Sequence, residues 1–258
     1  MSQYKGYLID LDGTIYRGKE RIPEAEDFIN ELIDRKIPFK IVTNNATKSI
    51  EEIVTNLNTS YNLSVNSSHI YTSILAMGDY LLDHYKGKNI FVIGEQALID
   101  YLEDIGMSLK TDEKIDVVVQ GLDRQVDYNK LNKAVNAILS GAHYLVTNMD
   151  RLIPIEEGHI PSSGAITAFI QFATRKNPLV IGKPYPTIME GALDRLGLNH
   201  SEVLMIGDNY DTDILAGINS GLDTLLVLTG ITHKEDIKDT DRRPTYIVNS
   251  LKEWQDQL

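Results

Sequence analysis

Apolar runs alternate with amphipathic segments along most of the chain. Apolar residues recur at helical spacing, for example, at 25–35, 48–57, 96–105 and 128–139. Apolar strands separated by amphipathic helices are typical of a parallel sheet with right-handed crossover connections. The pattern therefore predicts an α/β fold with a Rossmann-like, doubly wound parallel sheet as its core. The strand-like runs lie at 6–11, 39–43, 90–93, 116–120, 144–147, 179–182, 203–206 and 224–228.

Residues whose chemistry suggests a function are unevenly spread. They gather at 10–14, 43–45, 183 and 208–213, and the long interval between the second and third groups has its own alternation of strands and helices. We therefore expect a smaller α/β domain inserted into the first one. The predicted limits are 1–78 and 178–258 for the discontinuous core and 79–177 for the inserted domain, with a turn at Lys176-Asn177-Pro178 near the second boundary.

The composition excludes several classes of protein. With 258 residues, of which 42% are hydrophobic, the chain is long enough for two lobes. A formal net charge of −12 argues against nucleic acid or an anionic membrane as partner, because both attract basic surfaces. The absence of cysteine excludes disulfides, thiolate metal sites and cysteine nucleophiles. Apolar runs stay shorter than the ~18–20 residues of a spanning helix and no targeting segment is evident, so we expect a soluble, cytoplasmic protein.

Two aspartates, Asp10 and Asp12, stand one residue apart at the end of the first apolar run and lead into a turn at Gly13. Side chains at positions i and i+2 of a strand project the same way, so we expect these carboxylates to crowd together at the carboxyl end of the strand. Open α/β sheets bind their ligands at that edge. Two like charges so close favour a bound cation or one protonated carboxyl group. The alternative for this motif is a strand-end turn with a capping aspartate.

Two further strand ends carry polar residues. Thr43 and Asn44 follow the second apolar run and precede an expected helix start, where hydroxyl, amide and backbone N–H groups can bind an anion. An ordinary helix cap is the alternative for this pair. Lys183 follows the run at 179–182 between a glycine and a proline, so we expect it at the carboxyl edge of the sheet. There its charge could offset an aspartate and a bound phosphate, although an isolated lysine is usually solvated.

A fourth strand end is rich in carboxylates. Asp208 and Asp213 lie in a glycine turn after the run at 203–206. Carboxylate oxygens are the ligands that Mg²⁺ prefers, and neighbouring strands could each supply one. Asp213 could instead stabilise the amino-terminal end of the next helix.

The order of these motifs resembles the haloacid dehalogenase superfamily of phosphotransferases. The set reads Asp-x-Asp-Gly-Thr, Thr-Asn, Gly-Lys-Pro and Gly-Asp-x-x-x-Thr-Asp, each just after an apolar strand. The insertion between the second and third motifs resembles the α/β cap of the NagD-like, nitrophenylphosphatase-type branch, which is similar at 147–150 and 161–165. The resemblance implies a magnesium-dependent hydrolase of small phosphate monoesters, such as sugar phosphates, nucleoside monophosphates and nitrophenyl phosphate.

The resemblance also implies residue roles. Asp10 would attack phosphorus and form an aspartyl-phosphate. Asp12 would protonate the leaving alkoxide and later deprotonate the attacking water. Mg²⁺ would be held by the side chains of Asp10 and Asp208 and the backbone carbonyl of Asp12, with Asp213 as a direct or indirect ligand. The phosphoryl group would be bound by Gly13, Thr43, Asn44 and Lys183.

The inserted domain is expected to select the leaving group, because the core recognises only phosphate. The candidate residues are Asn148, Asp150, Ser162 and Ser163, and the alternative for each is a polar turn residue that caps a helix. The expected partner is thus a small phosphate monoester, with no nucleic acid and no membrane. A homodimer is left open, because cap-mediated dimers occur in relatives.

Three other functions are compatible with parts of the pattern. A signalling receiver domain also holds an aspartyl-phosphate with acidic residues, a threonine and a lysine, but its phosphoacceptor is not expected at the first strand. A catalytically silent protein that binds phosphorylated ligands would have lost a motif residue, and all are present. A dehalogenase or phosphomutase shares the fold, but Asp12 and the large insertion favour phosphoester hydrolysis over dehalogenation.

Overall fold

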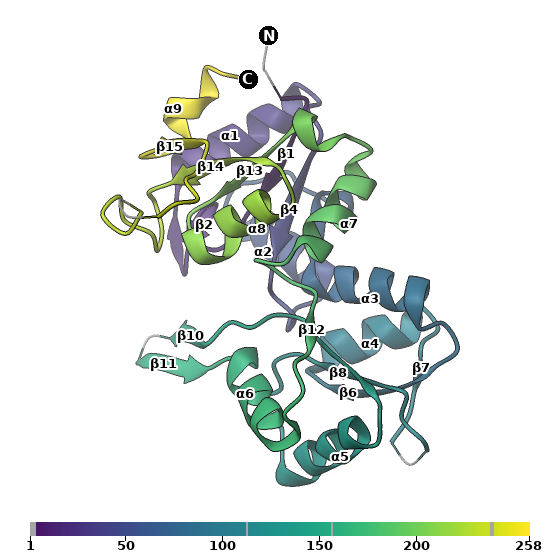
Figure 1. Ribbon diagram of the computed structural model, residues 1–258. Coiled ribbons are helices and arrows are strands. Elements are labelled where there is room, and N and C mark those ends of the chain that lie inside the picture. The colour runs from purple at the N-terminus through teal and green to yellow at the C-terminus, as the bar shows by residue number, and fades with distance from the viewer. Residues whose placement is uncertain (1–3, 112, 156, 238–239) are drawn as a thin grey trace. The chain divides into compact units, whose positions relative to one another are not determined.

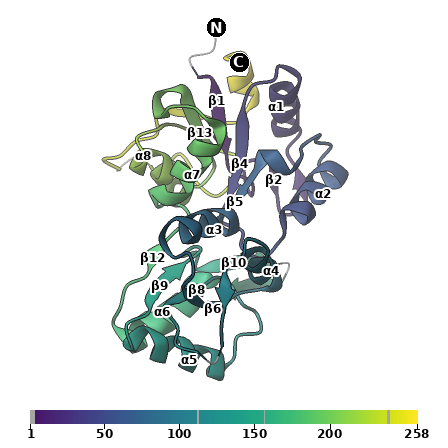
Figure 2. The same ribbon diagram turned by 90° about the vertical axis from the view of Figure 1, so that its right-hand side faces the viewer.

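Two compact units make up the protein, drawn as ribbons in Figures 1 and 2. The computed structural model describes residues 4–111, 113–155, 157–237 and 240–258. The first unit comprises Met1–Thr43, Ile50–Thr72 and Lys183–Leu258, and the second comprises Asn44–Ser49 and Ser73–Gly182. Each unit contains a parallel sheet with helices. The predicted α/β fold with a smaller inserted α/β part is therefore confirmed.

The division into units differs from the expected domain limits by a few residues. Helix α3 (Ser73–His84) contains the expected boundary between residues 78 and 79, and the whole helix packs with the second unit. Strand β12 (Leu179–Val180) also belongs to the second unit. Units defined by the packing of residues need not be domains that fold independently. The domain limits of 1–78 with 178–258 and of 79–177 therefore stay a prediction.

The sheet of the first unit has, within the described residues, six parallel strands. The chain runs outward from β1 through β4 to β5 on one side and from β13 through β14 to β15 on the other. The strand order thus reverses between β1 and β13, and open α/β sheets bind ligands at the carboxyl ends beside such a reversal. In spatial order the strands are β15 (Tyr246–Val248), β14 (Asp223–Val227), β13 (Val203–Gly207), β1 (Gly6–Ile9), β4 (Phe39–Thr43) and β5 (Ile70–Thr72).

The strand register sets which residues meet at that edge. Ile9, the last residue of β1, pairs with Ile206 of β13 and Ile41 of β4. Asp10 follows directly, and its backbone N–H continues the ladder to the carbonyl of Ile206 at 2.8 Å. The residues just after β1 and β13 therefore leave the sheet side by side.

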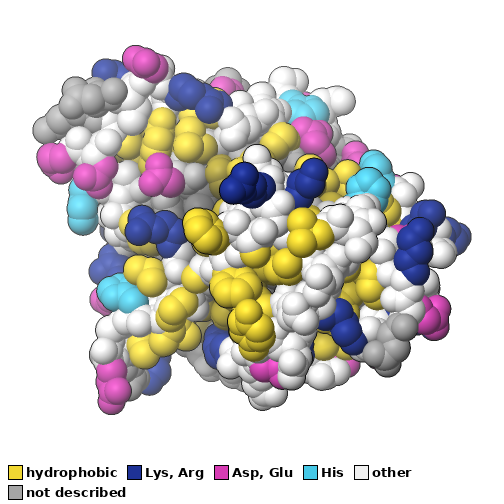
Figure 3. Space-filling model, turned by 60° about the horizontal axis from the view of Figure 1, so that its bottom comes forward, with side chains coloured by type: hydrophobic (Ala, Val, Ile, Leu, Met, Phe, Trp, Pro, Cys, Tyr) yellow, Lys and Arg dark blue, Asp and Glu magenta, His cyan; other side chains and the backbone are white. Residues whose placement is uncertain are grey.

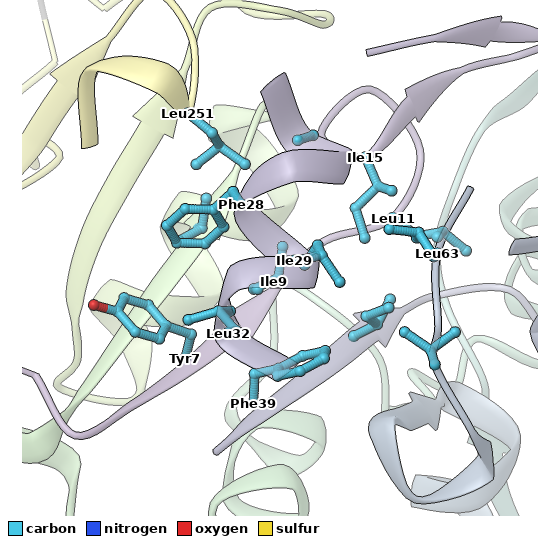
Figure 4. Close-up of a cluster of buried hydrophobic side chains, with 14 of the residues drawn as sticks. Tyr7, Ile9, Leu11, Ile15, Phe28, Ile29, Leu32, Phe39, Leu63 and Leu251 are labelled. Atoms are coloured by element: carbon cyan, nitrogen blue, oxygen red, sulfur yellow. The ribbon is translucent and has the colours of Figure 1, made fainter. Parts of the chain in front are cut away.

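Helix α1 (Pro23–Asp34) covers one face of this sheet. Proline at its first turn suits the helix start, and apolar residues at helical spacing give it one buried face. Phe28, Ile29 and Leu32 of that face pack on Tyr7 and Ile9 of β1, as Figure 4 shows. The rings of Tyr7 and Phe28 meet edge to face at 5.7 Å. Burying each such side chain contributes ~1.5–3 kcal/mol, which makes β1 a firm support for the residues that follow it.

The first unit contains a hairpin, a π-helix and further helices besides α1. A hairpin of β2 (Tyr16–Arg17) and β3 (Glu20–Arg21) follows β1, and a π-helix, η3 (Tyr210–Ile214), follows β13. The helices are α2 (Ile50–Ser60), α7 (Pro186–Leu196), α8 (Leu215–Asn219) and α9 (Lys252–Gln255), with 3-10 turns η1 (Ser67–His69) and η2 (His200–Glu202).

The second unit is built on five parallel strands among the residues described there. Their order is β12, β9 (His143–Val146), β8 (Val117–Gln120), β6 (Asn89–Ile93) and β7 (Ser108–Leu109). Helices α5 (Tyr128–Leu139) and α6 (Ser163–Thr174) pack together over a core of apolar strand residues. Helix α4 (Gln96–Asp104) packs on α3, and a hairpin of β10 (Leu152–Ile155) and β11 (Gly158–Pro161) precedes α6.

Strand β12 corrects one expectation. The run at 179–182 was expected to be a strand of the catalytic core, with Lys183 at the edge of its sheet. Instead β12 pairs with β9 of the second sheet, with Leu179 opposite Leu145. Backbone hydrogen bonds continue past the strand, from Ile181 to the Val146 carbonyl and from Gly182 to the Thr147 carbonyl, both at 2.9 Å. Lys183 is therefore the first residue of the chain after it leaves the second unit.

Several large apolar side chains of the second unit are exposed. Phe172 of α6 is 91% exposed, and Tyr128 and Leu139 of α5 are also on the surface. Figure 3 shows hydrophobic side chains interspersed with lysine and arginine on the face that it presents. The homodimer that the resemblance left open stays a prediction. Throughout the described ranges, the helices are too short or too polar to cross a membrane.

Candidate active site

Three buried carboxylates converge at the strand ends of the first unit. Asp10 follows β1, Asp208 follows β13, and Asp213 lies in η3. One carboxylate oxygen from each lies within 4.8 Å of the others. The side chains are almost inaccessible to solvent, with at most 7% of any of these residues exposed. Buried like charges are unfavourable unless a cation or hydrogen bonds compensate them.

Lys183 supplies one such cation. Its ammonium group donates to Asp10 Oδ1 at 2.5 Å, to Asp213 Oδ1 at 2.7 Å and to the Val42 carbonyl at 2.9 Å. These contacts use all three of its donors. Burial lowers the pKa of Lys183, but the carboxylates of Asp10 and Asp213 outweigh it and raise the pKa above its ordinary value. The lysine is therefore charged, and the prediction that it offsets an aspartate at this edge agrees with the geometry.

The charge at the site remains negative. Three ionised carboxylates and one ammonium carry a formal charge of −2. Burial and, secondly, the charge of Asp213 raise the pKa of Asp10 well above its ordinary value. The same two causes raise the pKa of Asp208 to about 6. Excess negative charge on hard oxygen donors fits a divalent cation such as Mg²⁺, so the buried carboxylates fit a metal site.

Neighbouring loops hold Asp208 in place. Its Oδ1 accepts a hydrogen bond from Thr14 Oγ1 at 3.2 Å, and its Oδ2 accepts one from the Ile231 backbone N–H at 2.8 Å. A Cβ atom on Gly13 would lie 2.3 Å from Asp208 Oδ2, and one on Gly230 would lie 1.9 Å from it. Gly13 also has φ = +95°, a conformation that favours glycine. Only glycine lets both loops approach this carboxylate so closely.

Asp213 is fixed from two sides. Its Oδ1 receives the lysine contact, and its Oδ2 accepts the backbone N–H of Asn209 at 3.0 Å. The approach to β13 depends on Gly207, where a Cβ atom would lie 2.2 Å from the Cβ of Asp213. Asp213 therefore does more than stabilise the amino-terminal end of a helix, since it neutralises the buried ammonium group.

Asp12 lies outside this cluster. β1 ends at Ile9, so the alternation expected to bring Asp10 and Asp12 to one side does not extend to Asp12. Asp10 is buried, whereas Asp12 is exposed. The pKa of Tyr16, a buried residue of β2, is raised first by burial and then by the nearby charge of Asp12.

The segment after β4 differs from the sequence prediction. Thr43 ends β4 and is buried. It follows Val42, whose carbonyl accepts a hydrogen bond from Lys183. A helix was expected to start near Asn44, but α2 begins only at Ile50. Asn45 Oδ1 accepts the backbone N–H groups of Thr47 and Lys48 at 2.9 and 3.1 Å, which forms a turn instead. The prediction of a helix terminus at Thr43–Asn44 was therefore wrong.

Asn44 is surrounded by residues of the second unit, to which it belongs. Its Nδ2 donates to Asp150 Oδ1 at 3.2 Å, and its carbonyl accepts from Asn148 Nδ2 at 2.9 Å and Ser73 Oγ at 2.8 Å. Asn148 Oδ1 in turn accepts the backbone N–H of Asp150 at 3.1 Å. A Cβ atom on Gly182 would lie 2.5 Å from Asn44 Oδ1. Two residues expected to select the leaving group therefore hold Asn44.

The other two candidates lie at the start of α6. Ser162 precedes the helix and Ser163 is its first residue, and both are buried. Ser163 Oγ accepts from Gln120 Nε2 at 2.9 Å, and Gln120 Oε1 accepts from Thr167 at 2.6 Å and Tyr144 at 3.0 Å. This buried network favours the structural alternative for Ser163.

Several residues around the site were missed from the sequence. Thr14 belongs to the first motif but received no role, although its hydroxyl contacts Asp208. Gly230 and Ile231 lie in the loop after β14. Gly230 lets the backbone approach the Asp208 carboxylate closely, and the backbone N–H of Ile231 donates a hydrogen bond to it. A glycine just past an apolar strand was the only available signal for that loop. Tyr16 gave none, because an aromatic residue near a strand usually indicates packing.

Two family models match the chain. One, described as haloacid dehalogenase-like hydrolase, matches residues 7–108, and one described as HAD-hydrolase-like matches residues 180–254. The chain is 41% identical over 254 residues to a protein named 5'-nucleotidase YutF of Bacillus subtilis, covering 98% of both chains. It is 44% identical over 253 residues to a protein named acid sugar phosphatase of Staphylococcus aureus, covering 98% of this chain and 97% of the other.

Solved structures are similar over nearly the whole chain. A single mutant of a thermostable NPPase from Geobacillus stearothermophilus superposes with a TM-score of 0.92 at 45% identity, covering 98% of this chain and 99% of the other. A p-nitrophenyl phosphatase from Archaeoglobus fulgidus superposes with a TM-score of 0.93 at 34% identity, covering 99% and 100%. Both units therefore have counterparts in these proteins.

Proposed function

The chain belongs to the haloacid dehalogenase-like hydrolases and is a phosphatase of their p-nitrophenylphosphatase branch, and from this premise we propose that it hydrolyses small phosphate monoesters with Mg²⁺ through an aspartyl-phosphate. The observation that supports this most is the convergence of Asp10, Asp208 and Asp213 on one point, with Lys183 against two of them. Such a site combines a nucleophile with the charges that phosphoryl transfer requires.

The proposed metal ligands are all hard oxygen donors. Asp10 and Asp208 would hold Mg²⁺ by their side chains and Asp12 by its backbone carbonyl, with Asp213 as a direct or indirect ligand. When bound, the ion would neutralise charge on the phosphoryl oxygens. The glycines that close around Asp208 would keep its carboxylate in one orientation for this purpose.

Asp10 is the proposed nucleophile. Its carboxylate would attack phosphorus as the bond from phosphorus to the leaving oxygen breaks. Lys183 holds Asp10 Oδ1 in place, and its charge lowers the pKa of Asp10 in opposition to the larger effect of burial. In the second step water would attack the same phosphorus, releasing inorganic phosphate and restoring the Asp10 carboxylate.

Asp12 is the proposed acid and base. It would give its proton to the leaving oxygen in the first step and take one from water in the second. Its exposure suits this role, because the group must reach a ligand outside the buried cluster. An acid–base residue contributes ~10²–10⁴-fold, so stabilisation of charge must supply most of the acceleration.

The phosphoryl-binding groups are proposed from the motif order. Gly13, Thr43, Asn44 and Lys183 would bind the phosphoryl oxygens. Lys183 and the ion together would create a locally positive site in a protein with a net charge of −12. This resolves how an acidic protein attracts an anionic substrate.

The proposed cap is residues 79–177, which lie within the second unit, and it would select the leaving group. The relatives suggest the substrate class, since one is named a 5'-nucleotidase, one an acid sugar phosphatase and one a p-nitrophenyl phosphatase. We therefore infer activity on nucleoside monophosphates, sugar phosphates and nitrophenyl phosphate. Ser162 and Ser163 are retained as proposed selecting residues. Asn148 and Asp150 are retained as proposed substrate-binding residues that act through Asn44 on the phosphoryl group common to all these substrates.

The test is phosphate release from a panel of these monoesters, with Mg²⁺ and with a chelator. We expect many turnovers per protein molecule with Mg²⁺ and almost none with the chelator. Asp10→Asn serves as the blank, and Asp12→Asn should lose turnover while binding Mg²⁺ as the unaltered protein does. Release that stops near one equivalent would instead indicate a receiver-like phosphoacceptor. No release from any member of the panel would indicate a silent binding protein.

A further inference from the structure

The loop after β14 carries two threonines that lie outside the four sequence motifs. Thr229 and Thr232 stand on either side of Gly230, where the backbone comes close to the Asp208 carboxylate, and of Ile231, whose backbone N–H donates to it. The loop follows β14, which is the neighbour of β13 in the sheet. Each threonine makes a side-chain hydrogen bond to a different adjacent segment, so the loop is attached on both sides of its contact with Asp208.

Thr229 attaches the loop to the turn after β1. Its hydroxyl donates to the Gly13 carbonyl at 2.8 Å, and the residue is half-buried. The Thr229 carbonyl also accepts from the guanidinium of Arg17, but that side chain is 57% exposed, so water competes for the contact. The bond to Gly13 therefore fixes this end of the loop against the first motif.

Thr232 attaches the other end of the loop to the segment after β13. Its hydroxyl accepts the backbone N–H of Tyr210 at 2.8 Å, and its own backbone N–H donates to the Asp208 carbonyl at 3.2 Å. Only 5% of Thr232 is exposed, so solvent has little access to replace these bonds. A backbone N–H that loses its acceptor in such a place is unfavourable. Thr232 therefore holds its end of the loop firmly against the fourth motif.

Between these two attachments, the Ile231 backbone N–H donates to Asp208 Oδ2 at 2.8 Å. Resting on the proposed function, in which Asp208 is a ligand of Mg²⁺, we propose that Thr229 and Thr232 are positioning residues that hold this N–H on the Asp208 carboxylate. The carboxylate then keeps one orientation toward the other two carboxylates of the cluster. A ligand that is already ordered loses less conformational entropy when the ion binds, so the affinity for Mg²⁺ is higher.

The proposal predicts that loss of either hydroxyl weakens the binding of Mg²⁺. Thr229→Val and Thr232→Val keep the branched shape of the side chain and remove only its hydrogen bond. We expect the dissociation constant of Mg²⁺ to rise ~10-fold in each variant, because removing a group that orients a metal ligand typically costs ~10–100-fold in affinity. Thr229→Ser and Thr232→Ser keep a hydroxyl and should bind Mg²⁺ within ~2-fold of the unaltered protein.

The measurement is calorimetric titration with Mg²⁺ in the absence of substrate. A partly unfolded preparation changes the stoichiometry of such a titration, whereas the dissociation constant comes from the folded molecules. Urea unfolding with a chelator present records the stability of each variant separately. An unchanged dissociation constant in either valine variant would overturn the proposal, whatever the loss of stability.

Thr174→Val is the matched control. Thr174 is also 5% exposed, and its hydroxyl accepts the backbone N–H of Lys176 at 3.2 Å, but it lies in α6 of the second unit. This variant should lose stability much as Thr232→Val does and should bind Mg²⁺ as the unaltered protein does. An equal loss of Mg²⁺ affinity in the two variants would overturn the proposal, because a general loosening of the fold would then explain both.

The double variant tests whether the two threonines act on one loop. If freeing either end already releases the Ile231 N–H, Thr229→Val combined with Thr232→Val should raise the dissociation constant by much less than the product of the single effects. Effects that multiply would overturn the proposal, because the two residues would then act independently. If the unaltered protein bound no Mg²⁺, the proposed function would fail together with this proposal. That result is distinct from equal affinities among variants of a protein that binds the ion.

Discussion

The ammonium group of Lys183 lies 2.7 Å from Asp213, a carboxylate that lies 30 positions further along the chain and is equally buried. Asp10 lies on the other side of the same ammonium group, at 2.5 Å. Lys183 therefore separates two carboxylates that would otherwise repel each other. The first prediction follows from this arrangement.

Replacing Lys183 with methionine should destabilise the metal-free protein. The change keeps an apolar stem but leaves buried carboxylates without their cation, and breaking such a pair typically costs ~3–5 kcal/mol. The measurement is urea unfolding with a chelator present. Lys5→Met is the matched control, because the Lys5–Glu202 pair is exposed and screened by solvent. Equal stability losses in both variants would contradict the prediction.

The metal-free protein should lose stability as pH rises through the titration of Asp208. Burial raises the pKa of Asp208 from 3.8 to about 6, so the folded state binds this proton more tightly than the unfolded state. That contribution is fully present below pH 3.8 and disappears as pH rises to about 6. The measurement is the difference in unfolding free energy between the unaltered protein and Asp208→Asn, from pH 3.5 upward in steps of about one unit. Parallel curves for the two proteins would be the opposite result.

Glycine is required at position 13 for two separate reasons. Gly13→Ala should weaken binding of Mg²⁺ by ~10–100-fold, because the new Cβ atom would displace the Asp208 carboxylate. Gly18→Ala is the control, since Gly18 also has a positive φ but has nothing within 4 Å of the added atom. Both variants should lose ~1–2 kcal/mol of stability through backbone strain. Calorimetric titration with Mg²⁺ separates strain from displacement, and equal affinities in the two variants would contradict this role for Gly13.

The contact of Asp150 with Asn44 predicts a uniform effect on catalysis. Asp150→Ala removes the acceptor for the Asn44 amide, so kcat/KM should fall ~3–10-fold by a common factor for nucleoside monophosphates, sugar phosphates and nitrophenyl phosphate. Asp150→Asn keeps an acceptor oxygen and should recover most of the loss. Steady-state kinetics on the three substrates decides the matter. A loss confined to one substrate would show that Asp150 contacts the leaving group directly.

Motif order was a good guide to the carboxylate cluster because strand ends can be recognised in the sequence. Continuous apolar runs before Asp10 and Asp208 fixed where each strand stops, and a parallel sheet brings such ends together. Asp12 was harder, because whether the strand extends two more residues is decided by the turn at Gly13. The positive φ of Gly13 cannot be predicted from the positions of apolar residues along the chain.

Other features depend on partners that are distant in sequence. The short strand β12 joins β9 rather than the first sheet, and two residues carry too little pattern to choose between sheets. The sequence after Thr43 suits a helix cap and a turn equally well, since asparagine favours both. The N–H group of Ile231 is available at every non-proline position, so no sequence pattern could mark it as a partner of Asp208.

Asn44, Ser73 and Gly182, at three of the four passages of the chain between the units, lie together in the second unit. Ser73 donates to the Asn44 carbonyl at 2.8 Å, and Gly182 lies against the Asn44 side chain. A segment whose ends already meet adds little loop-closure entropy to the sheet that it interrupts. Insertions and deletions in the segment between Ser73 and Gly182 are therefore expected to leave the strand pairing of the first sheet intact. The carboxylates at the ends of β1 and β13 can thus stay in place while the inserted segment changes in length.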